Sequence, residues 1–315
     1  RSPAEGTRSN HALRLSLAGL GYQELVNFSF VQEQWEKDFA DNDKPIRLLN
    51  PIASQLSVMR TQLLGGLVDI LRFNLNRKAD NVRVFELGRV FFPDETVGDS
   101  ETTVKGVRQP LHVAGLVYGD AHEDCWAEAK RPVDFFDVKG DVENLVAPLK
   151  ATFEAATHPA MHPGRCARVI VNGKAVGFVG ELHPKVCRVY ELPKPPVVFE
   201  LEVAPLCELD VPSARAVSKF QPVHRDISVT VPNDVTCAQL QDAVARIRRT
   251  KPEAMIIESL DLFDVYRPET SAEKSMAFRL TLSTQGSEAI GEKEAEAAFV
   301  AVEQAFADLG ATLRK

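Results

Sequence analysis

The stretch HRDISVTV (His224–Val231) decides how the later part of this chain folds. Isoleucine and valine alternate with serine and threonine from 227 to 231, and this period of two is typical of a half-buried strand. The letters HRD also occur in the catalytic loop of protein kinases, where an asparagine must stand five residues after the aspartate to hold a metal ion. Here that position is Val231. We therefore predict a strand that begins with an Arg-Asp pair, and not a phosphotransferase site.

Working outward from this strand, the sequence predicts one ordered set of elements. A helix is expected at 236–249, strands at 255–266 and 274–283, a helix at 292–309 and a short strand at 311–314. The order β-α-β-β-α-β is that of a ferredoxin-like unit. A turn built around Arg267-Pro268-Glu269 joins the two long middle strands. The polar segment before the unit has no clear period, so we place a domain boundary there.

The earlier part of the chain predicts a second α+β domain. Its expected elements are a helix at 7–20, a strand at 22–31, a helix at 61–74, strands at 82–92 and 111–118, a helix at 137–150, a hairpin at 167–182 and a strand at 197–203. Asn172-Gly173 marks the turn of the hairpin. No crossover helix separates the strands at 82–92 and 111–118, so we expect them to be antiparallel. The predicted division is 1–210, a linker at 211–218, and 219–315.

Composition sets broad limits on the kind of protein. The 315 residues are 44% hydrophobic and 26% charged, which is typical of globular proteins. No apolar run approaches the roughly 20 residues of a membrane helix, so we expect a cytoplasmic protein with no membrane partner. The 5 cysteines form no CxxC pair and are expected to be reduced thiols. The net charge of -7 argues against a surface coated with cations, although a local basic face can coexist with it. Because the first residue is arginine, we expect a piece of a longer chain.

Six runs of sequence, taken together and in order, resemble the C-terminal part of the β subunit of bacterial phenylalanyl-tRNA synthetases. They are LLNPIASQLSVMRTQLLGGLV (48–68), RVFELGRVF (83–91), VDFFDVKGDVENLV (133–146), HPGRCARVIVNGKAVGFVGELHP (162–184), FQPVHRDISVTVP (220–232) and LFDVYRPE (262–269). The resemblance implies a class II synthetase-like antiparallel sheet domain without catalysis, followed by a ferredoxin-fold anticodon-binding domain. It also implies a whole enzyme that uses ATP and magnesium to attach phenylalanine to tRNA(Phe), and that is an α2β2 tetramer. In that enzyme this portion would pair with the α subunit and bind tRNA near the anticodon stem-loop. DNA is not expected as a partner.

The class II resemblance allows a test for catalytic residues. Class II sites bind ATP through an arginine in a Phe-Arg-x-Glu motif and through another in a Gly-rich motif, and both cations stabilise the phosphates. At the first position this chain has Phe85-Glu86, and at the second it has Phe199-Glu200 without glycines or arginine nearby. A carboxylate at Glu86 is expected to repel a nucleotide. We therefore predict no catalytic residues, and neither ATP nor magnesium bound by this chain. The helix at 7–20 would correspond to the subunit-interface helix, and burial in its own domain core stays an equal alternative.

Two clusters of possible metal ligands have simpler interpretations. The first contains imidazoles and a thiol, which are zinc ligands, but prolines at 159 and 163 interrupt its HxxxH spacing. The second is rich in carboxylates and could bind magnesium, but acids are also favoured at a helix start by the helix dipole. We predict no metal site. The clusters are His158, His162, Cys166 and His183, and Asp134, Asp137, Asp141 and Glu143.

For the smaller domain we predict RNA contacts through cations and aromatic rings. The alternative is that Arg225 pairs with a carboxylate and that Phe263 fills the core. A different class of function also stays open, a ferredoxin-like regulatory module that binds a small molecule. The predicted RNA-binding residues are Lys219, Phe220, Arg225, Arg267, Lys274 and Arg279, with further cations at Arg246, Arg248, Arg249 and Lys251 and further stacking surfaces at Phe263 and Tyr266.

Overall fold

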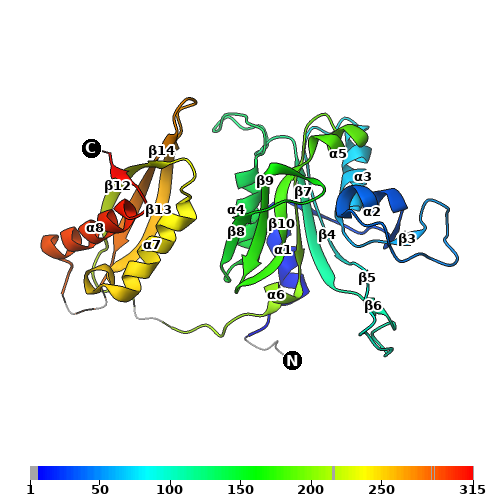
Figure 1. Ribbon diagram of the computed structural model, residues 1–315, viewed down its shortest axis with the longest axis horizontal. Coiled ribbons are helices and arrows are strands. Elements are labelled where there is room, and N and C mark those ends of the chain that lie inside the picture. Colours follow the sequence, from blue (N-terminus) through cyan, green and yellow to red (C-terminus); the bar gives the residue numbers. More distant parts are fainter. Residues whose placement is uncertain (1–5, 215–216, 285, 287, 315) are drawn as a thin grey trace. The chain divides into compact units, whose positions relative to one another are not determined.

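The computed structural model describes residues 6–214, 217–284, 286 and 288–314. The chain divides into two compact units, Arg1–Pro212 and Ser213–Lys315 (Figure 1). Residues 215 and 216 of the predicted linker lie outside the described residues. No helix within the described ranges is long and apolar enough to span a bilayer.

The first unit is built on a seven-stranded sheet in the order β1-β4-β7-β11-β10-β9-β8. Neighbouring strands are antiparallel throughout, except that β1 runs parallel to β4. The antiparallel pairing predicted for the strands near 82–92 and 111–118 is therefore confirmed. The strands are β1 (Gln23–Leu25), β4 (Val82–Arg89), β7 (Leu111–Tyr118), β8 (Ala151–Ala155), β9 (Met161–Val171), β10 (Lys174–Leu182) and β11 (Val197–Glu202).

Helices cover both faces of this sheet because successive side chains along its central strands point to opposite faces. On β4, Val84 belongs to the apolar cluster formed with α3, whereas Phe85 belongs to the cluster formed with α1 and α4. Leu13 and Leu17 of α1 are fully buried in the second cluster. The helices are α1 (Asn10–Gly19), α2 (Glu33–Ala40), α3 (Leu64–Leu75), α4 (Phe135–Val146), α5 (Pro184–Val189) and α6 (Ala204–Cys207).

The hairpin of β9 and β10 turns at Asn172 and Gly173 as predicted. Their φ angles of 50° and 75° are both in the left-handed region, which a two-residue turn of this kind requires. The strand predicted at 22–31 is instead split into β1 and β2, and between them the side chain of Asn27 donates to the Glu86 carboxylate. Two short ribbons complete the unit, one pairing β2 (Phe30–Val31) with β3 (Val58–Met59) and the other pairing β5 (Phe92–Pro93) with β6 (Val107–Arg108).

The second unit confirms the predicted ferredoxin-like order. Its four strands are all antiparallel in the order β13-β14-β12-β15, and α7 and α8 pack on one face. The alternating Ile227, Val229 and Val231 point into that core, where they join Phe278 and Phe306. The elements are β12 (Val223–Pro232), α7 (Cys237–Thr250), a 3-10 turn (Pro252–Ala254), β13 (Ile257–Tyr266), β14 (Glu273–Leu282), α8 (Glu292–Ala307) and β15 (Thr312–Leu313).

Candidate nucleic-acid interface

The face of the second sheet that α7 and α8 leave uncovered carries polar and aromatic side chains. Asp226 on β12 and Asp261 on β13 both lie directly opposite Arg279 on β14, so the three form one row across the sheet. On β12 and β14 the residues of this row alternate with buried core residues, which places Asp226 and Arg279 on the open face, and Asp261 joins them through its register with Arg279. This row therefore carries two carboxylates and one guanidinium.

The guanidinium of Arg279 is paired with Asp226 on this face. Its Nε and Nη2 atoms donate to the two carboxylate oxygens of Asp226, each at 2.8 Å. Its Cζ atom also lies 5.5 Å from the ring centroid of Phe263. The hydrogen bonds from Arg279 lower the pKa of Asp226, and the same bonds raise the pKa of Arg279. Arg279 thus links β14 to β12 on the open face. Its Nε and Nη2 donors are already used by Asp226, so this pair of donors is not free for a phosphate.

Two aromatic rings of β13 are exposed, Phe263 beside this pair and Tyr266 further along the strand. Phe263 is 56% exposed and Tyr266 is 57% exposed, and Tyr266 lies directly opposite Ser275 on the open face. The strand register shifts between Leu262 and Asp264, and such a bulge re-aims the side chain it contains. Exposed rings are suited to stacking unpaired bases. The hydroxyl and carboxylate groups of the same face can accept hydrogen bonds from the amino groups of those bases.

The six predicted RNA-binding residues are spread over the domain. Arg225 points to the helix side, where it donates to Glu292 of α8 at 2.6 Å. Lys274 is only 6% exposed, and its Nζ donates to the Asn233 carbonyl at 3.0 Å. Burial, and then the charge of Arg267, lowers the pKa of Lys274.

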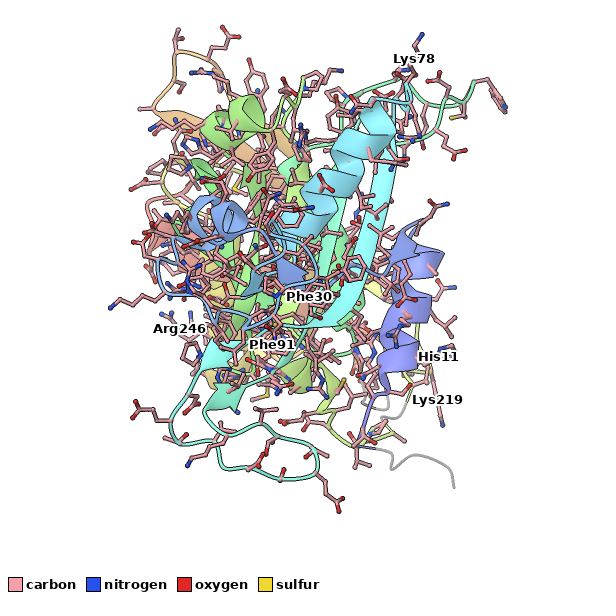
Figure 2. The ribbon with its side chains drawn as sticks, turned by 90° about the vertical axis from the view of Figure 1, so that its right-hand side faces the viewer. His11, Phe30, Lys78, Phe91, Lys219 and Arg246 are labelled. Atoms are coloured by element: carbon pink, nitrogen blue, oxygen red, sulfur yellow. The ribbon has the colours of Figure 1, made fainter. Side chains whose placement is uncertain are left out.

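The remaining predicted residues lie at the borders of the sheet. Lys219, which Figure 2 labels, and Phe220 precede β12. Arg267 follows β13 and is exposed. Of the six, Arg279 is thus the one that the strand register places on the open face. The sequence reasoning had no role for Asp226 beyond its place in HRD, and Asp261 was missed.

The two glutamates that replace class II arginines lie close together on one face of the first sheet. Glu86 on β4 and Glu200 on β11 are both directly opposite Ala114 on the intervening strand β7. Arg60 Nη1 donates to Glu86 Oε1 at 2.7 Å, and the two side chains are 4% and 3% exposed. Asn27 Nδ2 donates to the other carboxylate oxygen at 2.8 Å. Arg60 thus compensates the charge of Glu86, the carboxylate that we expected to repel a nucleotide.

This arrangement leaves no free cation for a nucleotide at these positions. Arg60 Nε donates to the carbonyl of Arg89 at 3.0 Å, so the guanidinium is used within the fold. The Glu200 carboxylate is held by the Leu63 backbone amide at 2.9 Å and by His112 Nδ1 at 2.7 Å. Because phosphate binding needs cations with unsatisfied donors, the residues present do not fit ATP.

The histidines considered as metal ligands act in local turns. Nδ1 of His162 accepts from the Gly164 amide, and Nδ1 of His183 accepts from the Lys185 amide, each at 3.0 Å. Burial lowers the pKa of His158. In the part of the chain that the structure describes, no group of three or more His, Cys, Asp and Glu side chains is arranged to hold a metal ion.

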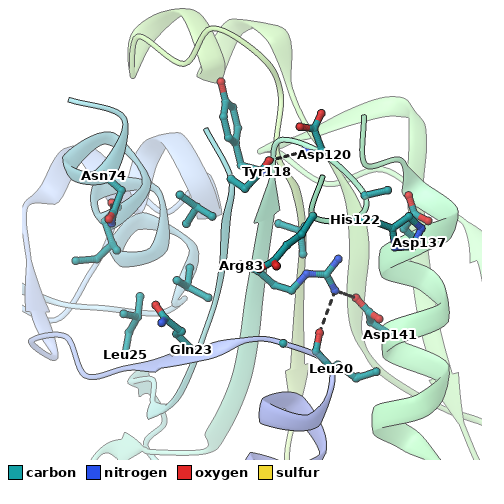
Figure 3. Close-up of a pocket in the computed structure, with 18 residues that line it drawn as sticks. Leu20, Gln23, Leu25, Asn74, Arg83, Tyr118, Asp120, His122, Asp137 and Asp141 are labelled. Carbon is teal, nitrogen blue, oxygen red and sulfur yellow. Dashed lines mark hydrogen bonds and ion pairs between the residues drawn. The ribbon is translucent and has the colours of Figure 1, made fainter. Parts of the chain in front are cut away.

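The acidic start of α4 borders a cavity of about 600 Å³, shown in Figure 3. Asp134 caps the helix, and Arg131 donates to Asp137 at 2.7 Å. Arg83 donates to Asp141 at 2.8 Å, although burial raises the pKa of that carboxyl. Because their partners lie within the fold, these acids are explained by helix capping and ion pairing.

Comparison with known proteins assigns both units. The family described as "Phenylalanyl tRNA synthetase beta chain CLM domain" matches residues 1–203, and "Ferredoxin-fold anticodon binding domain" matches residues 218–314. These matches confirm the predicted synthetase-like α+β domain followed by a ferredoxin-fold domain.

Similar proteins include the phenylalanine–tRNA ligase beta subunit of Cupriavidus pinatubonensis, which is 50% identical over 91% of this chain and 36% of its own length. The beta subunit from Chromobacterium violaceum is 49% identical over 98% of this chain and 38% of its own. The structure of Desulfitobacterium hafniense PylSc, a pyrrolysyl tRNA synthetase, overlaps 62% of each chain with a TM-score of 0.44 and 13% identity. The chain thus spans little more than a third of the curated relatives it matches, and it belongs to the phenylalanyl-tRNA synthetase β chain family.

Proposed function

We propose that this chain is a non-catalytic part of the β subunit of phenylalanine–tRNA ligase, and that its second domain binds tRNA(Phe) near the anticodon stem-loop. The observation that carries the proposal is the open sheet face, with the exposed ring of Phe263 beside the Asp226–Arg279 pair and the exposed ring of Tyr266 further along β13. Single-stranded loops are commonly recognised in this way, by bases stacked on side chains of a sheet.

The first domain supports the activity without performing it. Attachment of phenylalanine would take place in the α subunit of an α2β2 enzyme, with ATP and magnesium bound there. The side chains of Glu86 and Glu200 support this assignment. Each stands where the motif comparison expects an arginine, and each carboxylate is hydrogen-bonded to other residues of the same domain. We expect this chain alone to show no phenylalanine-dependent exchange between ATP and pyrophosphate. Measurable exchange would contradict the proposal.

A partner subunit would meet apolar side chains that lie outside helix α1. The apolar face of α1 is used within its own domain, since Leu13 and Leu17 are fully buried there. Figure 2 shows His11 on the outer side of that helix. Phe28, 66% exposed, and Leu49, 98% exposed, lie in segments connected through the β2–β3 ribbon. These side chains are our candidates for contact with the α subunit.

Binding of tRNA(Phe) across a salt series tests the function and separates it from the small-molecule alternative. Contacts to phosphates release counterions, so the logarithm of affinity should fall steeply and linearly with the logarithm of salt concentration. A chain that does not bind tRNA even at low salt would refute the proposal. That outcome would favour a regulatory module, which has no need of nucleic acid.

A further inference from the structure

The open face that is suited to bases is poorly suited to phosphates. Its central row contains Asp226 and Asp261 against one cation, Arg279, and that cation is already held by Asp226. Arg225 and Lys274 point to the helix side and are engaged there. Phosphate contacts normally dominate the affinity of a protein for RNA. If this domain binds tRNA, most of the neutralising charge must therefore come from outside the open face.

A group of cations at the end of α7 meets this requirement. We call Arg246, Arg248, Arg249 and Lys251 the α7 basic cluster. The three arginines are exposed and Lys251 is half-buried, and Figure 2 labels Arg246. Among the described residues, none of these four side chains has an ion-pair partner, in contrast to Arg225 and Arg279.

The distance between the cluster and the aromatic rings indicates the size of the ligand. The 3-10 turn separates α7 from the start of β13 at Ile257, so the cluster lies at that end of the domain. Phe263 and Tyr266 lie further along the same strand, roughly 20–30 Å from Ile257 at about 3.3 Å per residue. The nucleotides whose bases lie at the rings are therefore too far from the cluster to contact it themselves, and in a hairpin the stem supplies further phosphates.

We propose that the α7 basic cluster contacts the phosphate backbone of the tRNA stem while the open sheet face contacts the bases of the loop. This rests on the proposed function, and it adds a division of labour between two faces of one domain. The contact is with backbone, so it should depend on charge and on the presence of a stem, and it should not depend on sequence.

The test compares the full wild-type chain with a variant in which all four cations of the cluster are changed to glutamine. Removing one cation that touches a phosphate should reduce the slope of log affinity against log salt by about 1, so the variant should have a slope smaller by up to about 3 to 4. In this variant the binding of cognate and of non-cognate tRNA should weaken equally. A single strand with only the loop sequence should be bound as tightly as by the wild-type chain. A matched control removes equal charge from the first unit, through Lys44→Gln, Lys78→Gln, Lys105→Gln and Lys174→Gln.

The outcomes separate this inference from the function on which it rests. Wild-type chain that does not bind tRNA would refute the proposed function itself. Binding that is weakened by Phe263→Ala, but keeps its salt slope in the cluster variant, would refute only the inference. In that case the cations would be explained by the dipole of α7, which favours positive charge at a helix C-terminus. An equal decrease of slope in the control would also refute it, since total charge would then be sufficient.

Discussion

Arg60 and Glu86 form a buried ion pair with 2.7 Å between Nη1 and Oε1, at the position where the class II motif led us to expect an arginine. The pair joins segments that are far apart in the sequence. Arg60 directly follows β3, Glu86 lies in the middle of β4, and Asn27, which also donates to Glu86, lies in the segment between β1 and β2. The position that would otherwise face a ligand is therefore part of the scaffold.

Replacing Arg60 alone should be costly. Arg60→Met leaves Glu86 charged and buried without its partner, and we expect the free energy of unfolding to fall by about 3–5 kcal/mol. Arg60→Met combined with Glu86→Leu removes both charges and should recover much of that stability. Both tryptophans, Trp35 and Trp126, lie in the first unit, so tryptophan fluorescence in a urea titration reports on this unit alone. A double variant less stable than Arg60→Met would contradict this account.

Gly88 is required by the same pair. A Cβ atom at this position would lie 2.3 Å from Arg60 Nη2 and 3.0 Å from Glu86 Oε1, so Gly88→Ala must displace the guanidinium. We expect stability to fall by about 1–3 kcal/mol, and by less when Arg60 is already methionine. Gly98→Ala is the matched control, because nothing lies within 4 Å of its added Cβ. Equal effects at the two glycines would exclude a steric role for Arg60.

The sequence was sufficient to predict the order of elements in the second unit, because apolar and polar residues alternate clearly along β12 and β14. That alternation also carried information that our choice of RNA-binding residues did not use. Arg225 lies two residues before Ile227, and Lys274 lies two residues before Met276. Residues two apart on a strand point to the same face, so both cations share a face with the core. The position of a cation along the alternating strand therefore decides which face it lies on, whereas its residue type does not.

The first unit was predictable in its main elements, but its candidate site was not. Motif comparison directed attention to Glu86 and Glu200, and both lie on strands of the sheet, β4 and β11. The pairing of Glu86 with Arg60 depends on a tertiary contact between segments that no local pattern connects. Strand β8 and helix α2 were missed for a related reason, since short elements with few apolar residues have little periodicity.

Thiol chemistry should distinguish the buried cysteines from the exposed one. Burial raises the pKa of Cys166 and of Cys187 to about 11, whereas Cys125 is exposed. Alkylation at pH 8 should therefore modify Cys125 first, and the other two only on unfolding. Because the unfolded thiols lose protons near pH 9 and the folded ones do not, stability should fall as pH rises from about 9 to 11. Peptide mapping after brief alkylation measures the order in which the thiols react. Equal rates of alkylation at Cys125, Cys166 and Cys187 would contradict the prediction.

The exposed rings should matter for RNA and little for folding. Phe263→Ala or Tyr266→Ala should each weaken tRNA(Phe) binding by about 1–3 kcal/mol, the usual effect of removing one stacking ring. Both rings are more than half exposed, so thermal unfolding of the domain should shift only slightly. Phe136→Ala is a matched control, because this ring is 72% exposed but lies on α4 of the first unit. If the control weakened binding as much as the other two, the base contacts would have to be sought away from the open sheet face.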